Sequence, residues 1–415
     1  MSPAPGPFRP GFWRSPLRGP WLTAALGSVL LVLVTIVAVT GFLSHAAYEP
    51  DLPSNAVVPR DADLPLTFFS WPTGPPWLYA LNQGLHVNVG LVAVPVLLAK
   101  LWSVIPRLFA WPPVASPAQG IERLAIALLV SSAIFEFVTG IMNAQYWYAF
   151  HFNFVIAHYY GAVVFVASLV LHVAVKSPAI LHAYRTRGWL KPLRDDLAHT
   201  RPEPADEHGG LVPVDPDPPT LSRRGLIAFV GAGSAALLVA NMGETLGGPF
   251  RPLAFLAPRR EDFPVNKTAA RAGVTRDMVG AAYRLRLAGG GDEVSLSRAE
   301  LLAQPQHTAR LPIACVEGWT TTQEWTGVRL SELARLAGIE RPDGAFVRSL
   351  QPAGILAKTS LDGDAVRDPD ALLALKVNGA DLPLDHGFPA RIIVPALPGV
   401  HNTKWVGSIE FGSEA

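Results

Sequence analysis

Five long apolar runs constrain this chain more than any other feature of its sequence. The first, residues 21–43, carries no charged side chain and can cross a bilayer as a helix at about 1.5 Å of rise per residue. It exceeds the apolar core of a cleavable signal peptide, so we expect an anchor that is retained. Further runs at 77–104, 124–143, 151–175 and 225–246 predict four more spans. A hydrophobic share of 50% combined with only 16% charged residues and a positive mean hydropathy is unusual for a soluble protein.

Charge is distributed unevenly around these runs and predicts their orientation. Basic residues gather before the first run and after the fourth, at Arg9, Arg14, Arg18, Lys176, Arg185, Arg187, Lys191, Arg194 and Arg201. Because cytoplasmic loops are enriched in Lys and Arg, we expect both segments in the cytoplasm. Five spans then place everything after Gly247 on the extracytoplasmic side of the plasma membrane, with membrane lipid around the spans. The net charge of +1 indicates no nucleic-acid partner.

These patterns predict a multi-domain protein in which an all-α transmembrane bundle precedes an α+β domain. The predicted parts are a cytoplasmic N-terminus (1–20), a four-helix membrane domain (21–176), a Pro/Asp-rich cytoplasmic linker (177–221), a fifth span (222–246) and an outer domain (247–415). In the outer domain, alternating apolar residues at 283–287 and 391–394 indicate strands, and residues 331–336 indicate a short helix.

The chain has a single cysteine, Cys315, so it can form neither an internal disulfide nor a multi-thiolate metal site. The residue type alone allows three roles for this cysteine. It can be a buried hydrophobic filler, which is the commonest fate of a free cysteine, a nucleophile, or a one-thiolate metal ligand. The residues around it decide which role to expect.

Several short motifs accompany this cysteine in a characteristic order. Residues 316–319 (Val, Glu, Gly, Trp) follow it, then 325–328 (Trp, Thr, Gly, Val), 385–395 (Asp, His, Gly, Phe, Pro, Ala, Arg, Ile, Ile, Val, Pro), Gly399 and 404–406 (Lys, Trp, Val). Together, residues 262–411 resemble the molybdopterin-binding domain of the sulfite oxidase family. The resemblance implies an oxidoreductase with a molybdenum–molybdopterin cofactor and a small-molecule substrate.

The resemblance also implies a role for individual residues. Cys315 would be the catalytic molybdenum ligand, and its soft thiolate suits that metal. The remaining cofactor contacts would come from His386 and Arg391 at the pterin, from Asn402, Thr403 and Lys404 at its phosphate end, and from Asn266, with Gln351 or Ser349 as a further contact. Arginine and lysine side chains are suited to a phosphate group.

Histidines within the apolar runs indicate a second cofactor. His158 and His172 are 14 residues apart, so they share a helix face about 21 Å apart along the axis, and His86 lies in the second run. Such residues can also be packed or hydrogen-bonded without a ligand. The four-span unit resembles the b-type cytochrome subunits of membrane formate dehydrogenases and hydrogenases. The resemblance implies one haem b between His86 and His158, and a second at His172 only if another ligand exists.

The fifth run begins with Ser222, Arg223, Arg224 and Gly225, which resembles a twin-arginine export signal in an internal position. Two arginines can equally be an ordinary basic flank. Export in the folded state would suit a domain whose cofactor is inserted in the cytoplasm, and it agrees with the orientation expected from charge.

We therefore expect a membrane-bound molybdenum oxidoreductase that takes electrons from the quinone/quinol pool through haem and transfers an oxygen atom from a small S- or N-oxide. The neutral-to-acidic segment after Cys315 favours such a substrate over an anion. One alternative is oxidation of a sulfite-like substrate with electrons passed to quinone. Another is a non-catalytic membrane scaffold with a metal-free outer domain.

Overall fold

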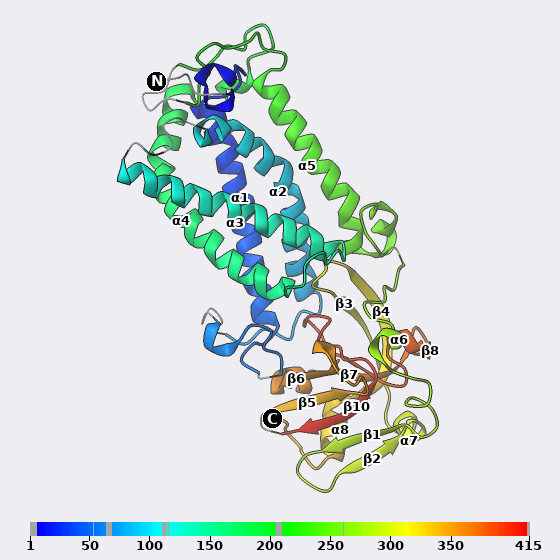
Figure 1. The fold of residues 1–415 in the computed structure, drawn as a ribbon. Coiled ribbons are helices and arrows are strands. Elements are labelled where there is room, and N and C mark those ends of the chain that lie inside the picture. Colours follow the sequence, from blue (N-terminus) through cyan, green and yellow to red (C-terminus); the bar gives the residue numbers. More distant parts are fainter. Residues whose placement is uncertain are drawn as a thin grey trace. The chain divides into compact units, whose positions relative to one another are not determined.

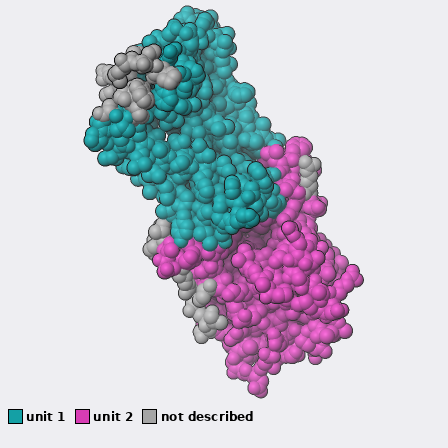
Figure 2. Space-filling model, in the orientation of Figure 1, with its two compact units in different colours: residues 1–38, 86–240 teal, residues 39–85, 241–415 magenta. Residues whose placement is uncertain are grey.

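The computed structural model describes residues 6–412, except for 53, 64–68, 110–113, 115, 205–209 and 260. The two ends of the chain and part of the predicted linker therefore lie outside the described residues. The chain forms two compact units (Figure 2). One consists of residues 1–38 and 86–240, and the other of residues 39–85 and 241–415.

Five long helices account for the apolar runs (Figure 1). They are α1 (Pro20–Ala47), α2 (Leu78–Leu108), α3 (Pro117–Ala144), α4 (Phe154–Arg187) and α5 (Arg223–Leu246). All five are long and apolar enough to cross a membrane. Helix α4 continues well beyond the apolar run that ends at residue 175, includes Pro178, and ends before Gly188, whose φ of +72° and N–H bond to Tyr184 O cap the helix. The first basic residue after the apolar run predicts where a span would leave a membrane. It does not predict the end of the helix, which lies at Arg187.

The C-terminal part is an α+β structure with two five-stranded sheets. The first has the order β2-β1-β10-β5-β6, and the second has the order β3-β4-β7-β8 with β9 paired to β7. Its strands and helices are α6 (Ala269–Ala272), β1 (Arg284–Ala288), β2 (Val294–Ser297), α7 (Arg298–Ala303), β3 (His307–Ala314), β4 (Thr320–Arg329), α8 (Leu330–Leu336), β5 (Gly344–Ser349), β6 (Lys358–Asp362), α9 (Gly363–Arg367), β7 (Leu372–Val377), β8 (Ala380–Asp381), β9 (Arg391–Ile393) and β10 (Val406–Phe411). Strands β1 and β10 are parallel, and the other pairs are antiparallel.

Local sequence explains these elements. Strand β1 alternates exposed arginines with fully buried Leu285 and Leu287, as expected for a strand with one buried face. Helix α7 begins with a capping box, in which Ser297 and Glu300 each accept a hydrogen bond from the other's backbone N–H. At the bulge between β4 and β7, a Cβ on Gly327 would lie 2.0 Å from Leu373 O, so only glycine fits there.

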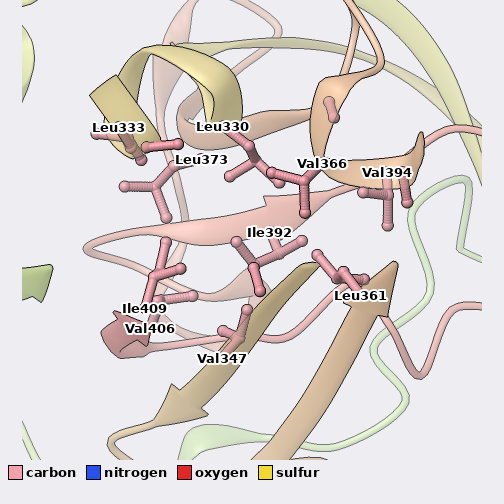
Figure 3. Close-up of a cluster of buried hydrophobic side chains, with 14 of the residues drawn as sticks. Leu330, Leu333, Val347, Leu361, Val366, Leu373, Ile392, Val394, Val406 and Ile409 are labelled. Atoms are coloured by element: carbon pink, nitrogen blue, oxygen red, sulfur yellow. The ribbon is translucent and has the colours of Figure 1, made fainter. Parts of the chain in front are cut away.

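The core of this unit lies between its two sheets and the helices α8 and α9 (Figure 3). Leu330 and Leu333 of α8 meet Leu373, Ile392 and other aliphatic side chains from both sheets, and all are almost completely buried. These contacts bring strands that are far apart in the sequence into one hydrophobic core.

The same unit includes residues 39–85, which comprise the end of α1, the loop that follows and the start of α2. In the loop, Asn55 donates to Ser360 O (2.9 Å) and accepts from Ser360 N (2.9 Å), which pairs the loop with strand β6. Trp71 donates to Ala396 O (2.8 Å). The compact unit is therefore larger than the segment 247–415 that the sequence delimits.

We predict that Leu373→Ala lowers the free energy of unfolding of this unit by about 2–5 kcal/mol, because it leaves a cavity in a close-packed core. Equilibrium unfolding of the detergent-solubilised protein, followed by near-ultraviolet dichroism, measures the change. Leu336→Ala is the control, since Leu336 is 40% exposed. An equal loss in both variants would contradict this account of the core.

Candidate functional site

Cys315 lies in the tight turn between β3 and β4. Its backbone N–H donates to Trp319 O (2.9 Å), and the N–H of Gly318 donates to Cys315 O (3.0 Å). Gly318 has a φ of +102°, in the left-handed region that residues with side chains rarely adopt. We call residues 315–319 the thiol turn. Its hydrogen bonds hold the thiol at a defined place at the end of β3.

The carboxylate of Glu317 folds back over the thiol. Cys315 Sγ donates to Glu317 Oε2 (3.3 Å), and the same oxygen accepts from Trp319 Nε1 (2.9 Å). Arg259 Nη1 lies 3.4 Å from it. Burial, and next the charge of Glu317, raise the pKa of the Cys315 thiol well above its ordinary value. A thiol kept protonated is a poor nucleophile, whereas a metal ion deprotonates its thiol ligand. The surroundings of Cys315 therefore disfavour a role as nucleophile, and leave the roles of buried filler and metal ligand.

Arg391, on strand β9, is a buried cation. Its Nη1 donates to His386 O (3.2 Å), and its guanidinium lies 5.6 Å from the centroid of the Trp325 ring. Burial lowers its pKa to about 9. A charged group in such a place is stable only when a partner compensates for the lost hydration.

Lys404 is a second buried cation, and it lies near Arg391, since a Cβ on Gly387 would meet both side chains. We call these two residues the buried basic cluster. Lys404 Nζ donates to Lys267 O (2.5 Å) and to Asp385 O (2.9 Å). Burial, and next the charge of Arg391, lower the pKa of Lys404 to about 6. The Cys315 thiolate lies close enough for its charge to raise this pKa slightly. Lys404, Arg391 and Cys315 therefore share one site. An anionic group such as a phosphate would restore the charged form of the lysine.

Several buried polar atoms of the predicted cofactor contacts have no hydrogen-bond partner among the described residues. They are Arg391 Nε, Gln351 Oε1, Asn402 Nδ2 and Thr403 Oγ1. Buried polar groups are nearly always paired, so such a cluster indicates a polar ligand. Asn402 is held in place, since its Oδ1 accepts from Val394 N (2.8 Å). These donors and acceptors fit a phosphate-bearing pterin cofactor.

His386 contributes an aromatic surface. Its ring stacks on Phe263 with centroids 3.5 Å apart and planes at 12°. Burial, and next the charges of Arg391 and Lys404, lower the pKa of His386 to about 4. The imidazole is therefore neutral at ordinary pH and can accept as well as donate a hydrogen bond.

Asn266 and Ser349 lie beside Lys404. Asn266 Oδ1 accepts from Lys267 N (2.8 Å), next to the carbonyl that binds Lys404. Ser349 Oγ donates to Lys404 O (2.7 Å). The structure brings these residues together with Arg391 and Lys404, and their direct contact with a cofactor stays a prediction.

Three residues near the site were not predicted. Arg259 pairs with Glu317, and Tyr48 lies close enough to Tyr79, Cys315 and Glu317 for burial and these groups to raise its pKa well above the ordinary value. His401 Nδ1 lies 2.8 Å from Thr359 Oγ1, and its ring is 6.1 Å from that of Tyr48. The position of His401 beside Asn402 is a signal that could have found it. Nothing in the sequence connects Tyr48 with Cys315.

The other unit contains the candidate haem ligands His86, on α2, and His158, on α4. Their ring centroids are 6.2 Å apart, with planes at 83°. Two imidazoles that bind one iron from opposite sides have centroids about 6 Å apart, since each bond is about 2 Å long and each centroid lies about 1 Å beyond its nitrogen. His86 Nδ1 lies 3.0 Å from Val37 O, and His158 Nδ1 lies 2.9 Å from Thr139 Oγ1. Such bonds to Nδ1 orient Nε2 for a metal.

Helix α3 also supplies a carboxylate to His158. Glu136 Oε2 lies 3.2 Å from His158 Nδ1, and Glu136 is buried. A Cβ on Gly161 would lie 2.1 Å from Glu136 Oε1, so a glycine on α4 makes room for this carboxylate. A second haem at His172 stays a prediction. His45, near the end of α1, pairs with Asp63 (3.0 Å).

The C-terminal part of the chain matches known proteins. Residues 272–415 match the oxidoreductase molybdopterin binding domain. The mouse mitochondrial sulfite oxidase is 32% identical over 160 residues, which are 32% of this chain and 29% of that protein. The uncharacterized oxidoreductase YuiH of Bacillus subtilis (strain 168) is 32% identical over 120 residues, or 29% of this chain and 59% of that protein.

Among solved structures, the sulfane dehydrogenase SoxCD from Paracoccus pantotrophus is 25% identical, with a TM-score of 0.30, over 32% of this chain and 39% of that chain. The chain spans less than a third of the mouse and rat sulfite oxidases that it matches. The match to the oxidoreductase molybdopterin binding domain includes the thiol turn and the buried basic cluster, and residues 272–415 form such a domain, similar in sequence to part of the sulfite oxidases.

Proposed function

We propose that this chain is a membrane-bound molybdenum oxidoreductase that takes electrons from quinol through haem and reduces a small S- or N-oxide. The observation that carries the proposal is one buried thiol near two buried cations, Arg391 and Lys404, with unpartnered polar atoms on Arg391, Asn402 and Thr403. A metal-free scaffold would have no use for that arrangement, because buried cations and unpaired polar groups lower stability.

Different residues would hold the metal and the organic part of the cofactor. When bound, a molybdenum–molybdopterin cofactor supplies two-electron oxygen-atom transfer. Cys315 provides the one protein thiolate. Arg391 and Lys404 provide charge for the phosphate and pterin, and Asn402 and Thr403 provide hydrogen bonds at their unpartnered atoms.

The electrostatics beside the thiol support a neutral substrate. Glu317 places a carboxylate 3.3 Å from Cys315 Sγ, and the nearby Arg259 is paired with it. An anion such as sulfite would meet a negative group there, whereas a sulfoxide or N-oxide carries no net charge. Reducing such an oxide consumes two electrons and two protons, which one quinol supplies. Sulfite oxidation with electrons passed to quinone is the second candidate, favoured by the match to sulfite oxidases.

The haem proposal rests on the pair of histidines on α2 and α4. Their separation suits one iron, and the partners of both Nδ1 atoms suit haem ligands. A haem at that place would carry single electrons between a two-electron donor and the metal.

We further propose that the five helices cross the plasma membrane with the C-terminal domain outside, and that Arg223 and Arg224 direct its export in the folded state. The charge distribution and the helix lengths support this orientation. Arg223 also has a structural position, since it is 1% exposed and donates to Pro16 O (3.0 Å) and Arg201 O (2.9 Å).

Cys315→Ser should lower turnover of methyl sulfoxide substrates by more than the roughly 10- to 100-fold loss typical of changes around a metal ligand, because a hard oxygen replaces the soft thiolate. Pterin content should persist, because Arg391 and Lys404 are unchanged. Steady-state assays with sulfoxide and with sulfite, and molybdenum analysis, measure these effects. Thr321→Ser beside the thiol turn is the control. Normal turnover with a stability change of about 1 kcal/mol would mean a packing cysteine.

His158→Ala should abolish the sharp reduced α band of a bis-histidine haem in the purified protein, because one axial ligand is lost. His182→Ala is the matched control, since His182 is an exposed histidine on the same helix. Pyridine haemochrome analysis gives the stoichiometry. An unchanged spectrum would refute the assignment, and two haems per wild-type chain would establish a second site with His172 as its first candidate.

Reporter fusions after Thr200 and after Ala415 should report opposite sides of the membrane, and the same side for both would contradict the proposed orientation.

The fusion after Ala415 also tests export. Arg224→Lys keeps the charge and spares buried Arg223, so it should leave the reporter inside if the twin arginines are read as a signal. Arg185→Lys on α4 is the control. Undiminished export of the Arg224→Lys variant would indicate an ordinary basic flank.

A further inference from the structure

The thiol turn accepts two side-chain hydrogen bonds from helices that are distant in the sequence. Gln83 Nε2, on α2, donates to Val316 O at 2.7 Å. Thr245 Oγ1, near the end of α5, donates to Gly318 O at 3.0 Å. Gln83, Thr245 and the thiol turn all belong to the compact unit of residues 39–85 and 241–415. The turn is therefore bonded to two candidate membrane helices, on carbonyls either side of Glu317.

Gln83 is itself held by a buried polar network. Its Oε1 accepts from Ser44 Oγ (3.0 Å) on α1, and that hydroxyl is 3.1 Å from the Tyr79 hydroxyl. Gln83, Ser44 and Tyr79 are all buried. A side-chain amide that uses both its oxygen and its nitrogen in a buried network has one preferred orientation. Its Nε2 is thus aimed at the turn.

The packing beside Gln83 is equally specific. A Cβ on Gly84 would lie 2.3 Å from Thr245 Cγ2, so glycine at this position lets Thr245 approach α2 closely. A Cβ on Gly247 would lie 3.2 Å from Thr320 O, just after the turn. Two glycines therefore allow the close approach that brings the Thr245 hydroxyl to Gly318.

We infer that Gln83 and Thr245 are positioning residues that hold the thiol turn in the conformation in which Cys315 serves as a ligand. The inference rests on the proposed role of Cys315 as the metal ligand. Removing either donor leaves a carbonyl of the turn without its partner, and the turn relaxes toward other partners or solvent. Residues that orient a ligand affect its metal site without touching the metal.

The sole cysteine gives this inference a direct test. A thiol-reactive maleimide added to the full-length, cofactor-free protein, isolated in detergent from cells grown without molybdate, can label only Cys315. Gln83→Leu and the nearly isosteric Thr245→Val should each label roughly three- to tenfold faster than the wild type, which is the change expected for the loss of one hydrogen bond. Thr245→Ser keeps the hydroxyl and should label at the wild-type rate.

The control is Asn82→Leu. Asn82 adjoins Gln83, is buried, and donates to Thr40 O (2.9 Å) on α1 without contact with the turn. If Asn82→Leu accelerates labelling as much as Gln83→Leu does, the effect is a general loosening of the helix end and the inference is overturned. Wild-type labelling rates in both Gln83→Leu and Thr245→Val would also overturn it. Should Gln83→Leu fail to fold, Thr245→Val and Thr245→Ser carry the comparison.

A second measurement separates this inference from the proposed function. In protein from molybdate-grown cells, Gln83→Leu should keep its molybdenum and alter the EPR signal of the partly reduced metal. A molybdenum-free wild type would refute the proposed function, whereas the labelling rates would still decide whether Gln83 and Thr245 hold the turn. A normal EPR signal in Gln83→Leu, with molybdenum present, would refute the inference alone.

Discussion

Burial of positive charge is the constraint on which the functional site depends. Arg391 and Lys404 are both buried and lie near each other, and burial lowers the pKa of the lysine to about 6. A protein keeps such groups only when a compensating charge or hydrogen bond is available. Asn402 and Thr403 precede Lys404 and have buried polar atoms without a partner among the described residues. A phosphate-bearing cofactor would offer partners to these groups, which lie on or between strands β9 and β10.

The thiol turn is bonded to parts of two helices that belong to its own compact unit. Its backbone hydrogen bonds and the left-handed Gly318 define its shape, and Gln83 and Thr245 bind two of its carbonyls from helices α2 and α5. The loop between α1 and α2 also pairs with strand β6 through Asn55. The segment 39–85 is therefore a structural part of the unit that contains Cys315, and changes in the helices can alter the site without touching it.

The helical unit shows the same use of buried polar groups. A carboxylate within an apolar helix is costly and usually has a function. Glu136 meets His158, and Gly161 leaves room for it. The imidazole of His158 is thereby oriented toward His86, at a spacing that suits one iron. Pairing by hydrogen bond and space made by glycine thus recur at both candidate sites.

The sequence by itself determined the five apolar helices, the α+β class of the C-terminal part and the molybdopterin-binding character of residues 272–415. Apolar run length and alternation depend on local chemistry, and the motifs around Cys315, Arg391 and Lys404 are contiguous in the chain. The resemblance to b-type cytochrome subunits also predicted that His86 and His158 lie close together, and their ring centroids are 6.2 Å apart, while haem binding stays a prediction.

Only the tertiary structure decided which distant residues meet. It placed Tyr48 and Gln83 beside the thiol turn, gave Arg223 a buried structural position, and paired His45 with Asp63. It also extended α4 to Arg187 and joined residues 39–85 to the C-terminal unit. These contacts depend on packing between segments far apart in the chain, and no local pattern of charge or hydrophobicity records such packing.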